Sequence, residues 1–590
     1  MNKNSFVPPL LAAAVLATAN IVFAADRTIV KDGETINIQD KIYDNIQYEG
    51  EGGAVYVESE SNGKIDSINS STFDGNTAQS GGAIATDAWI GSEFSSSPII
   101  GAINDSIFTN NTATGVYFKD DLSDWPEEFE KPKAYETLSG SGGAINSFFV
   151  INEINNTVFS NNRVDITSLI TENPQYNLLQ VSASGGAVSG RIANIVNSTF
   201  TNNYVKSNGV SGGGALALAD NYIRRLVFNE DTGFEDIELT KLPAFNIKDS
   251  TFENNRAEGL YAAGGAVSAS GEVNITNTNF NSNKSENAGG AIYLSGITEQ
   301  IYNTDKNGEM QLVKTIYSDA VIKDSTFENN SVTNNKASDI YSNYYVDAFG
   351  EETAEEYYKT APQGGAIYSA GNLSIENTVF KGNSAFKTNE SGGLEGQGGA
   401  IYYNGEISED ISYYPELSIN NSKFENNSAV YGGALYNNGN INEFKGNTFK
   451  NNNAMHEYQN VEDISYDLEG EITSHSIHTS HDGYGGAIFN RIGDLQIEKN
   501  VFENNKAAYG GAIYNETTSD STLNISDSKF INNSSYNEDS DSGTLIVGDE
   551  TYTWNNEHYG LGSGGAVVSY GDTTIENSEF TGNTTGGGAG

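Results

Sequence analysis

The chain has no cysteine among its 590 residues, so no disulfide bond can hold its fold together. Lysine and arginine are scarce, 31 in total against 78 aspartates and glutamates, and the formal net charge at pH 7 is −47. A chain this acidic is a poor ligand for nucleic acids and for anionic lipid surfaces. Beyond residue 24, no apolar run is long enough to span a bilayer as a helix. The composition therefore predicts an acidic domain that relies on packing and hydrogen bonds.

The longest apolar run extends from Val7 to Val22, and Lys3 precedes it. A cleavage site follows at Ala24, so residues 1–24 are typical of a secretory signal peptide. A membrane anchor is the alternative, which the two prolines of the run disfavour. We expect the mature chain to be exported, either to the cell surface and outer membrane or as a secreted extracellular protein. The lack of cysteine also suits a chain that crosses a second membrane unfolded.

Two short patterns recur through the rest of the chain. A Phe with an Asn three residues later occurs thirteen times, and a Gly-Gly-Ala-aliphatic tetrapeptide also occurs thirteen times. In twelve of the thirteen units an Ile lies five residues before the Phe, and the exception is Phe444. This spacing predicts a repeat of about 25 residues in which the Phe and the Asn hold structural positions. The pairs include Phe73 and Asn76, Phe252 and Asn255, Phe424 and Asn427, and Phe502 and Asn505.

Bends must interrupt each unit, because positions five apart on a straight strand face opposite sides. The polar dipeptide between the Ile and the Phe, such as Asn421-Ser422, favours a turn, since Asn and Ser bond to their own backbone. A glycine seven residues after the first Gly of the tetrapeptide, such as Gly371 or Gly439, is expected to adopt the positive φ of another corner. Each unit then consists of short strands separated by turns.

Units of this length cannot bury an apolar face alone, so they are expected to stack as a solenoid. Short strands without helical periodicity predict an all-β fold, a right-handed parallel β-helix of at least thirteen coils with long loop insertions. The Phe and Ile columns would line its interior, and the Asn column would form a ladder of side-chain amides. Residues 25–51 are expected to form an N-terminal cap and first coil. Residues 52–590 are expected to form the repeat domain, truncated at its C-terminal end because another tetrapeptide begins there.

Long insertions interrupt the repeat, chiefly between the Asn and the next tetrapeptide, as in residues 331–363, 453–484 and 534–563. They are acidic and contain many aromatic residues, for example Tyr344 and Trp554. Solenoids carry insertions as loops on the flank of the rod, often on its binding side. The aromatic rings either contact a partner or cover the sheet of the rod.

Three of the five histidines, His475, His478 and His481, are evenly spaced within one insertion. Three imidazoles are a candidate set of ligands for a transition metal. No helical pattern aligns them, however, so a solvated loop is the preferred interpretation. The acidic insertions contain no calcium-binding repeat. We therefore expect no specific metal and no other cofactor.

A secreted carbohydrate-active enzyme is the alternative function, because many parallel β-helices are polysaccharide lyases or hydrolases. Of the four short motifs of the pectin hydrolases, the chain resembles only one, Asn303-Thr304-Asp305. Carboxylates are so frequent that no pair is distinguished as a glycosidase pair. The sequence assigns no catalytic residue, and we expect that the protein is not an enzyme.

A column of aromatic residues is expected on the outside of the rod. If the aliphatic residue of each tetrapeptide points inward, the residue after it must point outward. In the C-terminal coils this residue is aromatic, which predicts a candidate binding surface. The alternative is a stack of rings that only stabilises the outer sheet or is covered by a loop. The residues of this surface are Tyr293, Tyr368, Tyr402, Tyr436, Phe489 and Tyr514.

The two patterns, GGA[ILV] and FxxN, together resemble the repeat of the chlamydial-type polymorphic outer membrane proteins, and the resemblance extends from Gly52 to Asn583. It implies an autotransporter passenger that acts as an adhesin and meets the membrane only through a C-terminal β-barrel outside this chain. The implied partner is a protein or glycan on a host or neighbouring cell, and no nucleic acid. A structural surface filament is the third hypothesis.

Overall fold

The computed structural model describes residues 25–58, 62–86, 99–119, 136–167, 181–229, 233–305, 308–334, 341–346, 352–357, 361–388, 394–405, 415–454, 456–466, 472–516, 522–547, 550–560 and 562–586. The predicted signal peptide, residues 1–24, lies outside these ranges. Within them, no helix is long and apolar enough to cross a membrane.

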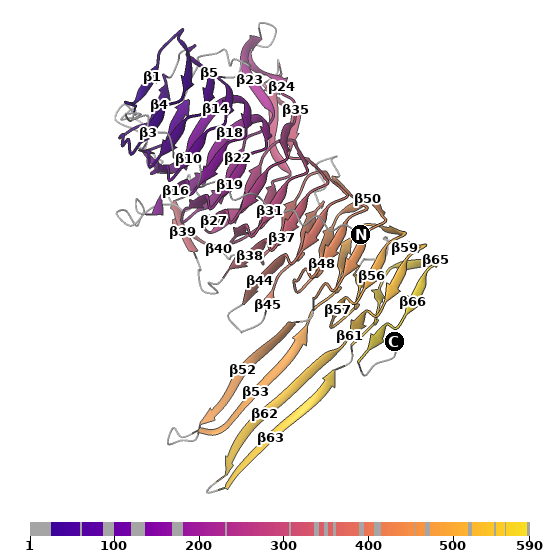
Figure 1. The fold of residues 1–590 in the computed structure, drawn as a ribbon. Coiled ribbons are helices and arrows are strands. Elements are labelled where there is room, and N and C mark those ends of the chain that lie inside the picture. Colours follow the sequence, from indigo (N-terminus) through magenta and orange to yellow (C-terminus); the bar gives the residue numbers. More distant parts are fainter. Residues whose placement is uncertain are drawn as a thin grey trace, which may run out of the picture.

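The chain winds into a stack of coils that follow one another in sequence order along a rod (Figure 1). One wall is a sheet of fourteen parallel strands that begins with β3 (Ile42–Asp44) and β6 (Thr72–Asp74) and ends with β66 (Glu579–Thr581). Each coil contributes one strand to this sheet, and thirteen of the fourteen strands carry the Phe of the repeat. The structure confirms the predicted all-β parallel β-helix.

The N-terminal stretch is continuous with this stack. Tyr43 of β3 pairs in register with Phe73 of β6, and their rings stack with centroids 4.9 Å apart. β1 (Thr28–Val30) pairs in parallel with β4 (Val55–Val57), which contains the first tetrapeptide's Val55. Tyr43 therefore occupies the position that Phe holds in the later coils.

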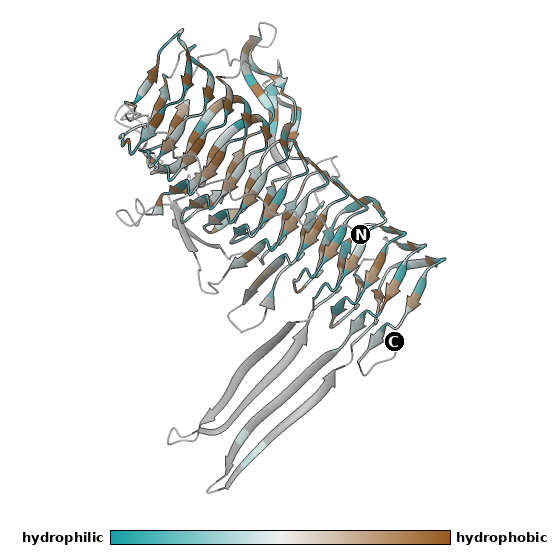
Figure 2. Ribbon diagram, in the orientation of Figure 1, coloured by the Kyte–Doolittle hydropathy of each residue, from teal (hydrophilic) through white to brown (hydrophobic). Residues whose placement is uncertain are grey.

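The second wall is one large sheet, to which most coils contribute two strands each. In one coil these are β46 (Ile401–Asn404), which begins with the aliphatic residue of the tetrapeptide, and β47 (Glu416–Asn420), which contains Ile419. Hydrophobic residues recur at equivalent positions of successive coils (Figure 2). The Ile and the Phe thus enter the interior from different walls.

The interior is a single apolar core along the rod. Phe424 is fully buried, and its ring stacks on Phe380 and Phe449 with centroids 4.8 and 4.6 Å apart. Phe444 is also buried, at the place that Ile holds in other coils, and its register partner in the preceding coil is Ile419. Parallel in-register pairing stacks identical side chains, which explains why the spacing is so regular.

The corners form at residues with a positive φ. Asn421, the first residue of the predicted corner dipeptide, has φ 52°. Asn426, directly before the ladder residue Asn427, has φ 57° and makes a second corner that the sequence analysis missed. Asn tolerates this left-handed conformation better than most residues do.

The predicted positive φ of the later glycine is present at Gly296, at 78°, but Gly371 and Gly439 lie outside the positive range. A Cβ atom at Gly371 would lie 1.9 Å from the carbonyl oxygen of Ser318 in the preceding coil. This position excludes a side chain because the backbones of two coils approach closely, and no reversal of φ is involved.

The two glycines of the tetrapeptide have different roles. Gly510 has φ 67°, which favours glycine. At Gly511 a Cβ atom would lie 2.2 Å from the carbonyl oxygen of Gly565 in the next coil. The first glycine therefore makes the turn, and the second lets neighbouring coils pack at strand spacing.

Several insertions form antiparallel hairpins and not the loops that we predicted. β23 (Tyr222–Asn229) pairs with β24 (Phe234–Lys241), and β34 (Ile297–Thr304) pairs with β35 (Met310–Tyr317). A third hairpin joins β39 (Tyr341–Val346) to β40 (Glu352–Tyr357). Cross-strand hydrogen bonds satisfy the backbone of these long polar segments, as a structureless loop would not.

Two more hairpins lie near the C-terminal end and join edge to edge. They are β52 (His456–Tyr466) with β53 (Ile472–Asp482) and β62 (Asn537–Val547) with β63 (Glu550–Gly560). β53 also pairs with β62, so the four strands make one antiparallel sheet that extends away from the rod (Figure 1).

The spacing of the coils explains this union. The two insertions follow the coils of Phe449 and Phe530, and the coil of Phe502 between them closes within residues 506–509. Two coils advance the rod by about 9.6 Å, which is the width of two strands. A hairpin on every second coil therefore fits edge to edge with the next hairpin. The pair β23–β24 and β34–β35, also two coils apart, shares an apolar cluster.

Candidate binding surface

The predicted Asn ladder lies inside the rod, where it has a structural role. Asn76, Asn255, Asn427 and Asn505 are fully buried, as are Phe73, Phe252, Phe424 and Phe502. Each Asn side chain donates to the side-chain oxygen of the Asn in the next coil, at 2.9 Å for Asn76 and Asn505 and 3.0 Å for Asn255 and Asn427. None of these residues reaches the surface of the rod.

A second ladder, which the sequence analysis missed, runs through the corner dipeptides. The hydroxyl of Ser422 donates to the carbonyl of Asn420 at 2.9 Å and accepts from the backbone N–H of Thr378 at 3.1 Å. The next coils continue the ladder with Asn447 and Asn500. The second residue of each dipeptide therefore links coils and does not only make a turn.

The predicted aromatic column stacks on the outer side of the tetrapeptide strands. Successive ring centroids lie 4.9 Å apart from Tyr293 to Tyr368, 5.3 Å from Tyr368 to Tyr402 and 4.9 Å from Tyr402 to Tyr436. The stack continues to Phe489 and Tyr514 at 5.0 and 5.4 Å. The strands that carry these residues pair in register, so each ring lies over its neighbour.

This column is not the open surface that we predicted. Tyr402, Tyr436, Phe489 and Tyr514 are only 6, 4, 3 and 8% exposed, whereas Tyr293 and Tyr368 are partly buried. The four form a cluster of their own outside the main core, and partly buried aromatic residues pack against them. This burial agrees with the alternative given in the sequence analysis, in which the stacked rings are part of the outer sheet and do not form an open binding surface.

The rings that cover the column belong to a second aromatic column, which we name the tyrosine rim: Tyr431, Tyr484 and Tyr509. Tyr484 stacks on Tyr431 at 5.3 Å and on Tyr509 at 5.1 Å. It also meets the ring of Tyr514 nearly edge-on, at 5.1 Å and 75°. The signal in the sequence was a Tyr directly before Gly-Gly, which occurs in three successive coils.

Burial changes the acidity of the covered phenols. Burial raises the pKa of Tyr436 to about 12, although Arg491 opposes the shift. Burial also raises the pKa of Tyr368, and a hydrogen bond with Asn404 opposes that shift. Both phenols therefore stay neutral at physiological pH and act as hydrogen-bonding groups.

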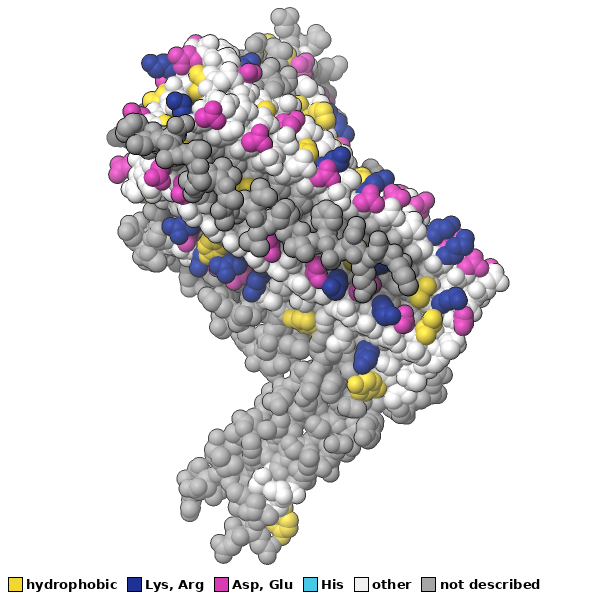
Figure 3. Space-filling view, viewed as in Figure 1, with side chains coloured by type: hydrophobic (Ala, Val, Ile, Leu, Met, Phe, Trp, Pro, Cys, Tyr) yellow, Lys and Arg dark blue, Asp and Glu magenta, His cyan; other side chains and the backbone are white. Residues whose placement is uncertain are grey.

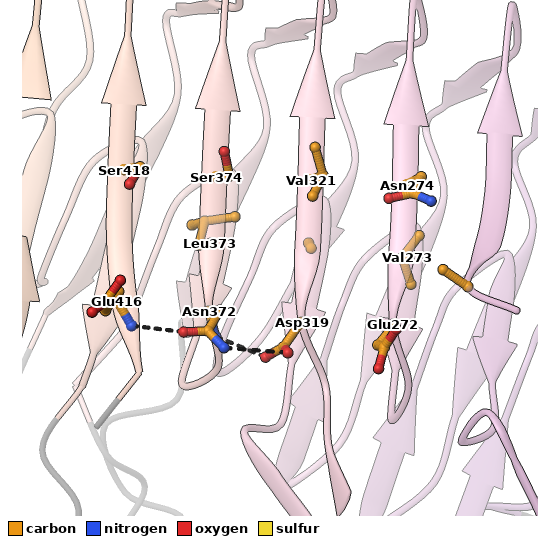
Figure 4. Close-up of a pocket in the computed structure, with 12 residues that line it drawn as sticks. Glu272, Val273, Asn274, Asp319, Val321, Asn372, Leu373, Ser374, Glu416 and Ser418 are labelled. Carbon is orange, nitrogen blue, oxygen red and sulfur yellow. Dashed lines mark hydrogen bonds between the residues drawn. The ribbon is translucent and has the colours of Figure 1, made fainter. Parts of the chain in front are cut away.

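A shallow groove of about 520 Å³ crosses the wall of Ile strands (Figure 4). The residues along one edge are Glu272, Asp319, Asn372 and Glu416, one from each of four coils (Figure 4). Asn372 donates to both oxygens of Asp319, from its backbone N–H at 2.9 Å and from its side-chain amide at 3.3 Å. Its own side-chain oxygen accepts from the backbone N–H of Glu416 at 2.9 Å.

These bonds give the groove's acidic edge a structural function. Asp319 and Asn372 tie three coils together where their strands begin, and Glu272 pairs with Lys241 at 2.5 Å. A general acid or base needs a carboxyl group that can reach a substrate proton. Both oxygens of Asp319 are engaged in these bonds and Glu272 is paired with Lys241, so these two carboxylates are held in structural contacts.

Charged side chains of both signs alternate on the visible face of the rod (Figure 3). Lys381 pairs with Glu328 at 2.8 Å and Lys450 with Glu503 at 2.9 Å, each across neighbouring coils. Exposed pairs of this kind contribute little stability each. Among the side chains that the structure describes, no group of three or more His, Asp or Glu residues could hold a metal ion.

Four segments of the chain match the model of the Chlamydia polymorphic membrane protein repeat, at residues 70–87, 277–295, 377–404 and 501–516. Each contains one Phe/Asn pair and the tetrapeptide that follows it. No curated protein and no solved structure matches the chain. The chain therefore carries Chlamydia polymorphic membrane protein repeats at four places, and each repeat leads from the Phe wall of the β-helix to the next tetrapeptide strand.

Proposed function

We propose that this chain is the passenger of an outer-membrane, autotransporter-type protein, and that it is displayed on the cell surface or secreted as an adhesin or interaction rod. The match to the Chlamydia repeat at four places supports the outer-membrane assignment. A rod of fourteen parallel coils gives the molecule the length to hold a binding surface away from a membrane. The signal peptide expected over residues 1–24 would direct export.

The tyrosine rim is the binding surface that we favour. Its ring faces are covered by neighbouring rings at 5.1 and 5.3 Å, so a sugar cannot stack on the middle ring. A partner would meet ring edges and phenol hydroxyl groups, which suit the hydrogen-bonding and apolar contacts of a protein interface. A cell-surface protein is therefore the preferred partner, and a glycan is the alternative.

Adhesion of the mature chain tests this function. Beads that carry residues 25–590 are expected to bind cultured cells more than beads that carry an unrelated acidic protein. Pretreatment of the cells with protease should abolish binding to a protein partner, and glycosidase treatment should leave it unchanged. Beads that bind no better than the acidic control would contradict the adhesin assignment.

An enzyme and a structural filament remain the competing functions. The groove of Figure 4 is the place where a polysaccharide would lie, but the carboxylate of Asp319 at its edge holds two coils together. A screen of the mature chain against plant, bacterial and animal polysaccharides separates the classes. Release of reducing ends or unsaturated sugars would favour the enzyme, and neither adhesion nor degradation would favour the filament.

A further inference from the structure

The hairpin of β34 and β35 has one face without any charged residue. In its register Tyr302 lies opposite Leu312, and Thr304 lies opposite Met310. Opposite residues of antiparallel strands share a face, and so do residues two apart on one strand. We name this surface the hairpin face, and its residues are Gln300, Tyr302, Thr304, Met310, Leu312 and Thr315. None of the six is charged, although the chain has a net charge of −47.

The opposite side of the same hairpin is covered by the hairpin of β23 and β24, and the two lie together beside the coil stack (Figure 1). Ile301 and Ile316 are 2 and 1% exposed and cluster with Tyr222 of β23. Asn303, which is also on this side, accepts a hydrogen bond at 3.0 Å from the backbone N–H of Ile237 in β24. The hairpin face therefore points away from β23 and β24.

Large apolar side chains are open to solvent on the hairpin face. Met310 is 68% exposed, Leu312 is 52% exposed and Tyr302 is 37% exposed. Val313, beside them at a register shift of β35, is 48% exposed. The hydroxyl of Tyr302 donates to the side-chain oxygen of Gln300 at 3.0 Å, which holds the Tyr302 side chain on this face. Exposed apolar side chains that gather in this way mark a site of contact with another molecule.

Charge indicates which partner suits the hairpin face. In a two-fold contact the same surface of both copies meets, so a charged surface repels its own copy. With 78 acidic and 31 basic residues, most of this chain is unsuited to such a contact, and the hairpin face is an exception. A basic partner would be attracted to the acidic surfaces of the rod, because the hairpin face offers it no ion pair. A second copy of the chain is therefore the partner that fits.

We propose that two copies of this chain associate through their hairpin faces about a two-fold axis. Sheets packed face to face lie about 10 Å apart, which lets Met310 of one copy contact the ring of Tyr302 of the other, and the reverse. The register shift at Val313 bends the edge of β35 and disfavours strand pairing there, so the contact uses the face and not the edge. A dimer carries two tyrosine rims, and linked binding sites strengthen adhesion by avidity.

Sedimentation equilibrium of untagged residues 25–590 tests this contact. A Kd of roughly 1 to 100 µM is expected, because a small apolar face makes an interface at the low end of stable sizes. Met310→Glu and Leu312→Glu should each weaken association at least tenfold, since each brings like charges together at the two-fold contact. Ile107→Glu on β10 (Ile107–Thr109) is the matched control, because Ile107 is 45% exposed on the Phe wall and the substitution adds the same charge. It should associate as the parent does.

The dependence on salt is a second readout of the same experiment. The acidic remainder of each chain repels its copy, so screening by added salt should tighten the dimer. Association that weakens with salt, a parent that is monomeric at about 100 µM, or a Leu312→Glu variant that dimerises normally would each overturn the proposal. A monomeric parent whose cell adhesion is lost in Leu312→Glu would assign the hairpin face to a different protein. Because sedimentation needs no cells, failure of the dimer is distinguished from failure of the proposed adhesin function.

The absence of cysteine allows a check of where the copies meet. Lys314 is exposed and lies opposite Ile301, so it is outside the hairpin face. Lys314→Cys provides a single thiol for a nitroxide label without altering the proposed contact. We expect dipolar coupling between the labels of two copies, and Leu312→Glu should abolish it while the circular dichroism spectrum is unchanged. A dimeric parent without this coupling, or coupling that persists in Leu312→Glu, would contradict the assignment.

Discussion

The side-chain oxygen of Asn452 accepts two hydrogen bonds from Asn427 in the preceding coil, from its backbone N–H and from its side-chain amide, both at 3.0 Å. The amide of Asn427 also donates to the carbonyl of Phe380 at 3.0 Å. Its oxygen accepts two bonds from Asn383 in turn. Each interior Asn thus links three coils, and no other residue type supplies this donor and acceptor set at the same size.

Asn427→Asp should destabilise the protein more than Asn427→Ser does. Serine loses hydrogen bonds at about 1 kcal/mol each, whereas a carboxylate places an acceptor against the oxygens of Phe380 and Asn452. Burial raises the pKa of such a carboxyl group, so the Asp variant is most stable at low pH and loses stability as the pH rises through that pKa. Denaturant midpoints at pH 4 and pH 7 measure the difference. Equal midpoints for the two variants at pH 7 would contradict the ladder.

Phe424→Ala should cost about 3 to 5 kcal/mol, because the ring is fully buried between two others. Val158→Ala is the matched control, since Val158 lies on the same wall and is 38% exposed. Its cost should be below about 0.5 kcal/mol. Urea unfolding followed by circular dichroism gives both values, and a Phe424→Ala cost below about 1 kcal/mol would place the ring outside the core.

Gly511→Ala should destabilise the stack by about 3 kcal/mol or more, because the new methyl group meets the backbone of the next coil. Gly212→Ala is the comparison, since the nearest atom to its added Cβ is the Ser268 Oγ at 3.3 Å. We expect that variant to melt within a few degrees of the parent protein. Similar melting temperatures for the two variants would show that the coils tolerate a wider spacing.

The columns inside the rod could be predicted from the sequence because parallel in-register stacking repeats the same residue at the same place. Phe424 and Asn427 show this, since their spacing survives insertions of any length between coils. The burial of Tyr402 and Tyr436 could not be predicted, because it depends on Tyr431 and Tyr484. These two residues directly precede the Gly-Gly turn of their coils, and strand alternation alone does not show that their rings pack against the column beyond that turn. The hairpins were missed because their polar alternation resembled a loop, although Asn307-Gly308, between β34 and β35, is a turn signal that could have identified one of them.

The pairing of β53 with β62 illustrates a further limit. It depends on two insertions that start two coils apart and extend in register. No local pattern contains that information, because the coil spacing and the strand spacing together set which insertions can meet.

Alkaline pH should weaken the aromatic cluster. Burial holds the pKa of Tyr436 at about 12, above the value of about 10 in an unfolded chain. Because the folded pKa is the higher one, the neutral phenol contributes stability below pH 10, and this contribution disappears as the pH rises through about 12. Melting temperatures between pH 9 and 12 should fall less for Tyr436→Phe than for the parent. Identical pH dependence would mean that this phenol does not titrate in the folded protein.

Cell adhesion by a tyrosine-rim variant tests the central claim most directly. The triple substitution Tyr431→Ser, Tyr484→Ser, Tyr509→Ser alters the partly buried rim, and Tyr293→Ser is the control at the far N-terminal end of the other column. Adhesion and thermal unfolding are measured on the same preparations of residues 25–590. The account predicts that the triple variant loses adhesion and that Tyr293→Ser adheres normally. The loss of three packed rings should lower the melting temperature of the triple variant, but its circular dichroism spectrum at the assay temperature should remain that of the folded parent. Full adhesion by a folded triple variant would contradict it.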